Sequence, residues 1–201
     1  MVRDEILERV AARAWEEGIA DAAYEHVDSP IGELLVVVSP RGVCRIGFPE
    51  ESHDASLLRV ASVMGPRVVR SVELTKELGD RLVAYLEGEP DELHMPVDLS
   101  LMQNEFGRRV LETLTETVGR GSVTTYGALA QRIGHPRAAR ATGTALGRNP
   151  IPIVVPCHRV VPGSGGVGNY GGGPDVKRLL LGLEGSLASV RRGGKVPGFD
   201  S

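Results

Sequence analysis

The sequence predicts an α+β protein with an N-terminal domain of helices around a small antiparallel sheet and a mostly helical C-terminal domain that contains a helix-turn-helix. Three observations predict it. β-prone runs separated by turn residues fill the early part of the chain, apolar residues recur at helical spacing in the later part, and the sign of the charge changes between the halves. We place the domains at residues 1–98 and 101–186, and we expect residues 187–201 to form a mobile tail.

The first domain begins with an amphipathic helix, because residues 3–18 carry apolar side chains at helical spacing among charged ones. Three β-prone runs follow within residues 22–48. The turn sequences SPIG and SPRG separate these runs, so we expect an antiparallel meander. Residues 72–87 place leucines on one helical face and predict a further helix.

Helices in close succession characterise the second domain. Residues 104–118 are amphipathic, and residues 125–134 form a short helix in which Thr125 is a suitable N-cap. The break Gly-His-Pro then separates this helix from another at residues 137–149. This spacing predicts a helix-turn-helix.

The last of these helices has a slim face, since Ala138, Ala139 and Gly143 are among its many small residues. Two interpretations are open. The face could pack against a neighbouring helix, or it could lie against DNA with arginines reaching out from a smooth surface.

The charge distribution favours the second half as the place of any DNA contact. Residues 1–100 hold 10 Lys/Arg and 20 Asp/Glu, a net charge of −10, whereas residues 101–201 hold 13 and 6, a net charge of +7. Basic patches attract DNA, although many are only solvated surface. With 41% hydrophobic residues the chain has enough apolar material for a globular core.

We expect a cytoplasmic protein with no membrane partner. The first 18 residues mix charged and apolar side chains, unlike a secretory signal. No stretch approaches the roughly 20 uninterrupted apolar residues of a membrane-spanning helix.

The two cysteines invite different interpretations. Cys44 lies in a strand-like run and is expected to be a buried small hydrophobe. Neither Cys44 nor Cys157 belongs to the paired Cys/His spacing of a structural zinc site, so the sequence predicts no metal and no disulfide framework.

The chemistry is expected at Cys157. A proline-punctuated, β-branched run from residue 149 predicts a strand whose end holds this thiol rigidly. Because the thiolate is the nucleophile, a reactive cysteine needs a base or a cation beside it, and His158 and Arg159 are the nearest candidates. Adjacency alone does not separate such a pair from a coincidence.

The surrounding motifs resolve this ambiguity. The pieces NP, IPIVVPCHRV, VGNYGGG and VKRLLLGLEG occur in this order and closely resemble the O6-alkylguanine-DNA alkyltransferase family, for which Pro-Cys-His-Arg-Val is highly specific. The resemblance runs from about residue 106 to residue 184, and more loosely over residues 29–48. It implies an RNase H-like fold for the acidic first domain.

The resemblance implies the catalytic roles. Cys157 would accept the alkyl group, His158 would draw off the thiol proton through a bridging water, and Glu184 would hold the imidazole. Glu184 also ends an apolar helix, where an unpartnered carboxylate is costly, although an exposed helix-end charge is the alternative. Asn149 would tie together the turn near the thiol. Tyr126 would donate a proton or hydrogen bond to the leaving guanine, the alternative being hydrophobic filler.

The substrate contacts are also implied by the resemblance. The guanine pocket would be lined by Tyr126, Pro152, Val160, Tyr170 and Gly171. No cofactor is expected, and the zinc site of some family members has no ligands here, since the first half holds a single thiol.

The expected partner is double-stranded DNA containing O6-alkylguanine. The base must be rotated out of the stack to reach the thiol, and Arg140 occupies the position of the family's arginine finger, which fills the hole left behind. The helix would lie in the minor groove. The remaining DNA contacts are assigned to Thr125, Arg137, Ala138, Ala139, Gly143 and Arg148, with solvated surface as the alternative for the two arginines.

The expected function is direct repair by stoichiometric, irreversible alkyl transfer, because the thioether at Cys157 is inert and the chain offers no second thiol to reverse it. Leu111 and Asn169 depart from common family residues, which leaves the range of alkyl groups open, as are O4-alkylthymine repair and clustering on DNA. Two rival functions are a non-catalytic protein that binds lesions, which the intact PCHRV motif argues against, and a cysteine hydrolase. A hydrolase needs neither a helix-turn-helix nor Arg140, and an adjacent Cys-His pair suits it poorly.

Overall fold

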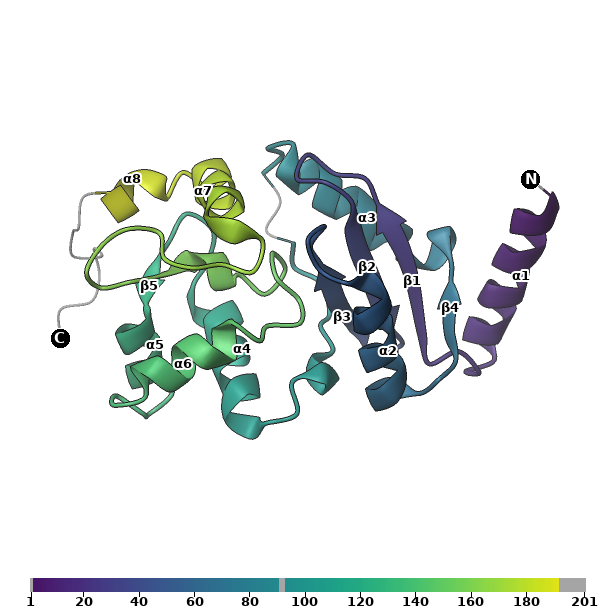
Figure 1. The fold of residues 1–201 in the computed structure, drawn as a ribbon, viewed down its shortest axis with the longest axis horizontal. Coiled ribbons are helices and arrows are strands. Elements are labelled where there is room, and N and C mark those ends of the chain that lie inside the picture. Colours follow the sequence, from purple (N-terminus) through teal and green to yellow (C-terminus); the bar gives the residue numbers. More distant parts are fainter. Residues whose placement is uncertain (1, 91–92, 192–201) are drawn as a thin grey trace. The chain divides into compact units, whose positions relative to one another are not determined.

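The computed structural model describes residues 2–90 and 93–191, and the chain divides between Leu101 and Met102 into two compact units (Figure 1). The predicted α+β class is confirmed. The first unit contains, in chain order, α1 (Val2–Glu16), β1 (Ala22–Val27), β2 (Leu34–Ser39), β3 (Gly42–Gly47), α2 (His53–Met64), β4 (Val68–Arg70), α3 (Val72–Leu86) and the 3-10 turn η1 (Leu99–Leu101).

The sheet of the first unit has the order β3-β2-β1-β4. The predicted meander is confirmed, since β1 pairs with β2 and β2 with β3 in antiparallel fashion. However, β4 pairs with β1 in parallel, with Ala22 opposite Val68, so the sheet is mixed rather than purely antiparallel. The strand β4 was not predicted because three residues are too short for a periodic signal, and α2 was not predicted either.

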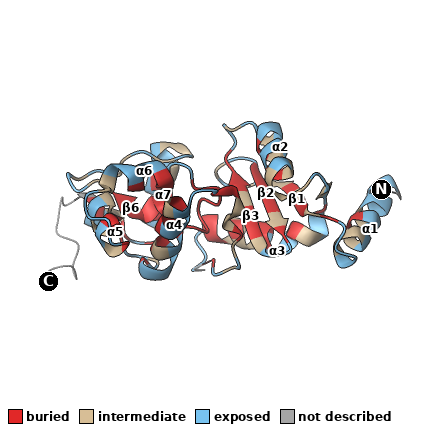
Figure 2. Ribbon diagram, turned by 90° about the horizontal axis from the view of Figure 1, so that it is seen from below, coloured by how far each residue is buried: buried red, intermediate tan, exposed pale blue. Residues whose placement is uncertain are grey.

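Two helices cover the two faces of this sheet. Figure 2 shows α2 and α3 on opposite sides of the strands, with buried residues between the layers. On one face Leu35 and Val37 of β2 pack in a cluster with Val60 of α2, whereas α3 contributes Leu78 and Leu82 to the core. Because successive side chains of a strand point to opposite faces, β2 supplies both layers and is almost entirely buried.

The second unit is mostly helical, as predicted. It contains α4 (Glu105–Thr117), β5 (Thr124–Thr125), α5 (Tyr126–Arg132), α6 (Ala139–Leu146), the 3-10 turn η2 (Cys157–Arg159), β6 (Val160–Val161), α7 (Gly173–Leu183) and α8 (Leu187–Arg191). The pair α5 and α6 forms the predicted helix-turn-helix. Thr125 caps α5 by accepting a hydrogen bond from the Ala128 amide at 3.1 Å, and Gly134 in the turn has a φ of 80°, which favours glycine.

The short helix α8 occupies the first residues of the segment expected to be a mobile tail. Val190 of α8 packs in a buried cluster with Val123 and Leu181. Apolar burial thus gives these residues a regular structure that the sequence pattern did not indicate. The rest of the expected tail, residues 192–201, lies outside the described residues.

Candidate active site and DNA-binding helix

The chain reaches Cys157 through an irregular loop at residues 149–156, and the predicted strand there is wrong. Three prolines in this loop lack the N–H that a sheet ladder requires. Ile153 has a φ of 75°, in the left-handed region, and the Val155 amide donates to the Ile151 carbonyl at 2.9 Å, which closes a turn. The thiol therefore stands at the start of the 3-10 turn η2.

Asn149 ties this loop together and contacts the sulfur. Its Oδ1 accepts a hydrogen bond from the Ile151 amide at 3.0 Å. Its Nδ2 donates to the Val155 carbonyl at 2.9 Å and lies 3.1 Å from the Cys157 Sγ. One buried amide thus fixes both the loop and the position of the thiol.

Cys157 is 9% exposed, and this burial raises the pKa of its thiol above the ordinary value. The hydrogen bond from Asn149 and the charge of Lys177 lower the pKa but do not outweigh burial. The thiol is therefore protonated at neutral pH. A reaction at this sulfur requires that its proton be removed when the substrate is in place.

Lys177 of α7 also belongs to this site, although the sequence did not predict it. It is buried, and its Nζ donates to the Val160 carbonyl at 2.7 Å and to the Asn169 carbonyl at 3.4 Å. Burial lowers its pKa to about 8, against the opposing influence of Cys157. Helical periodicity could have found it, since Lys177 precedes the buried Leu180 by three positions and so shares its face.

Glu184, at the end of α7, accepts hydrogen bonds from two neighbours in η2. The Nε2 of His158 lies 3.1 Å from its Oε1. Arg159 donates from Nε to both carboxylate oxygens, at 3.1 and 3.0 Å, and from Nη2 at 2.7 Å. Burial raises the pKa of Glu184, but these hydrogen bonds outweigh it and lower the pKa to about 2, so the carboxylate is ionised.

Arg159 therefore does not serve as a cation beside the thiol. Besides Glu184, it contacts the Val118 carbonyl through Nη1 at 2.7 Å. Its charge is compensated by the carboxylate in a buried, bidentate pair. In the sequence Arg159 is only two residues from Cys157, but in the structure its side chain reaches Glu184 at the end of α7.

His158 is fully buried, and this burial lowers the pKa of its imidazole despite the raising effect of Glu184. The ring is therefore neutral at neutral pH. With Nε2–H donated to the carboxylate, Nδ1 is the basic atom, and it has no hydrogen-bond partner in the described part of the chain. The ring of Tyr170 packs edge-on against it, with centroids 6.3 Å apart.

Tyr126 reaches this region through a short parallel ladder. Thr124 pairs with Val160 and Thr125 with Val161, so the first residue of α5 follows a strand that runs beside β6. Tyr126 is half-buried, and burial, followed by the influence of Cys157, raises the pKa of its hydroxyl. The group therefore stays protonated and can donate a hydrogen bond.

The four other residues expected to line the guanine pocket fall in two places. Pro152 lies in the loop before the thiol and Val160 directly after η2, and both are buried. Tyr170 and Gly171 lie in the loop before α7, where Tyr170 is half-buried and Gly171 exposed.

The helix α6 uses its small residues on two faces. Thr142, Ala145 and Leu146 are buried, and α6 packs against α4 and α5. Gly143 lies against the Tyr126 ring, which a Cβ at this position would approach to 3.6 Å. Packing against α4, α5 and the Tyr126 ring thus explains why several residues of α6 are small.

Exposed arginines lie on α6 and on the residues that flank it. The expected DNA contacts Arg137, Arg140 and Arg148 are exposed, and within the described residues none of them makes an ion pair. Ala138 and Ala139 are half-buried at the start of the helix. The exposed side of α6 and its flanking residues therefore offer positive charge that no carboxylate in the described ranges compensates, next to small side chains that leave the backbone accessible. No helix within residues 2–90 and 93–191 is long and apolar enough to cross a membrane.

A buried thiol with an imidazole and a carboxylate, in the same unit as a helix-turn-helix, defines a class of DNA-binding protein with cysteine chemistry. Two family models match the chain: the ribonuclease-like domain of 6-O-methylguanine DNA methyltransferase over residues 22–99 and its DNA binding domain over residues 105–186. The chain therefore belongs to the 6-O-methylguanine DNA methyltransferase family.

Individual relatives agree with this assignment. The methylated-DNA–protein-cysteine methyltransferase of Mycolicibacterium paratuberculosis is 40% identical over 161 residues, which span 80% of this chain and 91% of that protein. The protein of the same name from Rattus norvegicus is 36% identical and spans 83% and 84%. A crystal structure of Mycobacterium tuberculosis OGT in complex with DNA matches with a TM-score of 0.67 at 35% identity, over 82% of this chain and 94% of that chain.

Proposed function

We propose that this protein repairs duplex DNA by moving the alkyl group of O6-alkylguanine onto the sulfur of Cys157, once per molecule. One observation carries the proposal: Cys157 is held by Asn149 and is followed in η2 by a neutral imidazole that an ionised carboxylate, Glu184, orients. This is the arrangement that activates a protonated thiol on demand.

The transfer is a displacement at the alkyl carbon. The bond from sulfur to carbon forms as the bond from carbon to the guanine O6 breaks, and the electron pair stays on the guanine. The thiol proton passes to Nδ1 of His158, whose growing positive charge Glu184 stabilises. The Tyr126 hydroxyl gives its proton to the guanine as the base gains negative charge, so the base leaves with a proton in place of its alkyl group. The proton held by His158 then returns through solvent to Tyr126, which leaves both side chains neutral.

The proton path separates this function from that of a cysteine hydrolase. No direct hydrogen bond joins Cys157 to His158 in the described part of the chain, although both are buried. A hydrolase requires direct contact between nucleophile and base. We infer that a bridging water carries the proton, which suffices for a single turnover.

The DNA contacts follow from the exposed face of α6. We infer that this helix lies in the minor groove, with Thr125, Ala138 and Ala139 close to the backbone, and that Arg140 fills the hole left by the extruded base. Phosphate contacts are assigned to the uncompensated guanidinium groups of Arg137 and Arg148. The base would lie between the loop before the thiol and the loop before α7. A reducing, cytoplasmic setting fits a chain whose function needs a free thiol.

Stoichiometry tests the chemistry. Incubation with a duplex carrying labelled O6-methylguanine should move at most one label to each protein molecule, and intact mass spectrometry should place the added group on Cys157. The Cys157→Ser variant should gain no mass. Label transfer beyond one per molecule, or a modified Cys44, would contradict the proposal.

The role of Arg140 can be separated from the chemistry. With the free base O6-benzylguanine no extrusion is needed, so Arg140→Ala should react at the wild-type rate. With the duplex substrate its rate should fall about 10- to 100-fold, because the few kcal/mol of unstacking are no longer offset. Arg178→Ala, which removes an exposed arginine of α7, is the matched control. An equal loss on both substrates would place Arg140 in the chemistry instead.

A further inference from the structure

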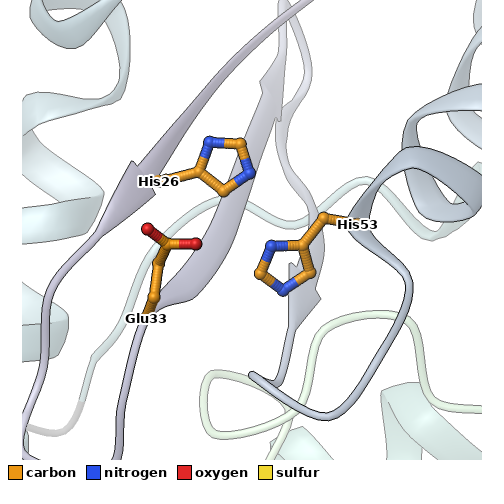
Figure 3. A group of neighbouring side chains, drawn as sticks. All are labelled: His26, Glu33 and His53. Carbon is orange, nitrogen blue, oxygen red and sulfur yellow. The ribbon is translucent and has the colours of Figure 1, made fainter.

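We propose that His26, Glu33 and His53 of the first unit form a binding site for a divalent transition-metal ion, with zinc as the expected occupant. Each residue offers one ligand atom, and these atoms all lie within 4.8 Å of one another. Figure 3 shows the two imidazoles and the carboxylate pointing toward one another. The site belongs to the acidic unit and is independent of the thiol chemistry.

The sheet register brings the three residues to one place. His26 of β1 pairs with Leu35 of β2, and Leu35 pairs with Gly47 of β3, so these positions form a row across the sheet. Glu33 precedes Leu35 by two residues and shares its face. His53 begins α2 on this face and lies over Gly47, where a Cβ would come within 3.3 Å of its ring.

The ligand atoms are available. The Nε2 of His53 is 3.0 Å from the Phe48 carbonyl, an arrangement that places the proton on Nε2 and leaves Nδ1 as the unprotonated nitrogen. Metal-bound histidines commonly donate their other ring N–H to a carbonyl in this way. Within residues 2–90 and 93–191, the Glu33 carboxylate and the His26 ring nitrogens have no hydrogen-bond or ion-pair partner. His26 is held in place by its stacking on His53, with centroids 5.2 Å apart.

The donor set selects the ion. Two imidazole nitrogens and one carboxylate oxygen suit zinc and related borderline metals rather than magnesium or calcium, which prefer oxygen ligands. Zinc would draw the ligand atoms to roughly 3.4 Å from one another, as bond lengths of about 2.0–2.2 Å require. Side-chain rotation of the three ligands would make this adjustment, most easily at the exposed Glu33. The excess of acidic residues in this half of the chain further favours a cation.

A metal ion at these three residues departs from the expectation of a chain without metal. The expectation of no metal rested on the absence of the paired Cys/His spacing of a structural zinc site. His26, Glu33 and His53 are instead scattered over 28 residues and meet only through the sheet. A bound ion would join the β1–β2 hairpin to the first residue of α2. It would therefore stabilise the folded first unit.

Zinc titration of the chelator-treated, full-length protein tests the site. Calorimetry in competition with a zinc indicator should show one ion bound per chain. His53→Ala and the milder, exposed Glu33→Gln should each weaken zinc binding at least about 10- to 100-fold, the range known for the loss of outer-shell partners. His94→Ala, which removes an exposed histidine of the same unit, should bind zinc like the wild type.

A cobalt spectrum excludes binding at a thiol. Cobalt at the proposed site should show visible d–d bands without the near-ultraviolet charge-transfer band of a thiolate ligand. Three outcomes would each overturn the proposal. They are wild-type zinc affinity in both His53→Ala and Glu33→Gln, a thiolate band in the cobalt spectrum, and no zinc binding by the wild type. Alkyl transfer by Cys157 would be unaffected by these outcomes.

Discussion

Both cysteines are buried and free, yet only one of them has the surroundings of a nucleophile. Cys44 of β3 is fully buried, its Sγ donates to the Val37 carbonyl at 3.4 Å, and burial raises its pKa to about 12. Its neighbours in the core are apolar. The predicted buried small hydrophobe is therefore confirmed.

Cys157 is also buried, and burial also raises its pKa, but polar groups surround it. Asn149 contacts the sulfur, Lys177 places a cation near it, and the next residue is an imidazole oriented by a carboxylate. Burial by itself therefore makes a thiol inert. Reactivity at Cys157 depends on a buried polar network that can take its proton when a substrate arrives.

Removal of the base, His158, should have the largest effect on the reactivity that distinguishes Cys157 from Cys44. His158→Gln keeps a polar side chain of similar size but no longer accepts the thiol proton at neutral pH. The second-order rate of alkyl transfer should fall about 10²- to 10⁴-fold at pH 7, and it should recover as the pH rises and the thiol ionises unaided. Quenched-flow assays with O6-benzylguanine measure this. A variant as fast as the wild type at pH 7 would exclude His158 as the base.

Removal of the carboxylate should destabilise the second unit. Glu184→Ala leaves Arg159 and His158 buried without their partner, and such a loss typically costs about 3–5 kcal/mol of the free energy of unfolding. Denaturation by urea measures it. Asp80→Ala, which removes an exposed carboxylate of α3, is the control and should change the stability little. A small loss for Glu184→Ala would show that water reaches the network.

The depressed pKa of Glu184 predicts an acid-sensitive fold. Its pKa of about 2 lies below the ordinary value of 4.5, so its stabilisation is present above pH 4.5 and is lost as the pH falls toward 2. With about 1.36 kcal/mol per pKa unit, the loss is about 3 kcal/mol. His158, whose pKa is also lowered, adds to the loss below pH 6.5. Urea denaturation from pH 7 to pH 2 should show that Glu184→Gln lacks the lower part of this dependence, and parallel curves would contradict this assignment.

The smallest effect is expected at the inert thiol. Cys44→Ala removes one buried sulfur from an apolar cluster and should lower the free energy of unfolding by about 1 kcal/mol. The rate and stoichiometry of alkyl transfer should stay at wild-type values. A lower rate would show that the first unit contributes to the chemistry.

The sequence predicted what depends on local pattern. Helical spacing located α1, α3, α4 and the helix-turn-helix, turn residues delimited the meander, and the PCHRV motif singled out Cys157 and His158. Hydrophobic periodicity and turn chemistry act over a few residues, so a single chain records them. Motif order supplied the distant Glu184, which periodicity alone could not have paired with His158.

Tertiary structure decided what depends on long-range packing. It paired Arg159 with Glu184 rather than with the thiol, buried Lys177 against the Val160 carbonyl, and turned the expected strand before Cys157 into a loop. It also brought His26 and His53 to one face of the sheet. Contacts between residues far apart in sequence arise from how elements pack, so no local pattern of amino acids encodes them.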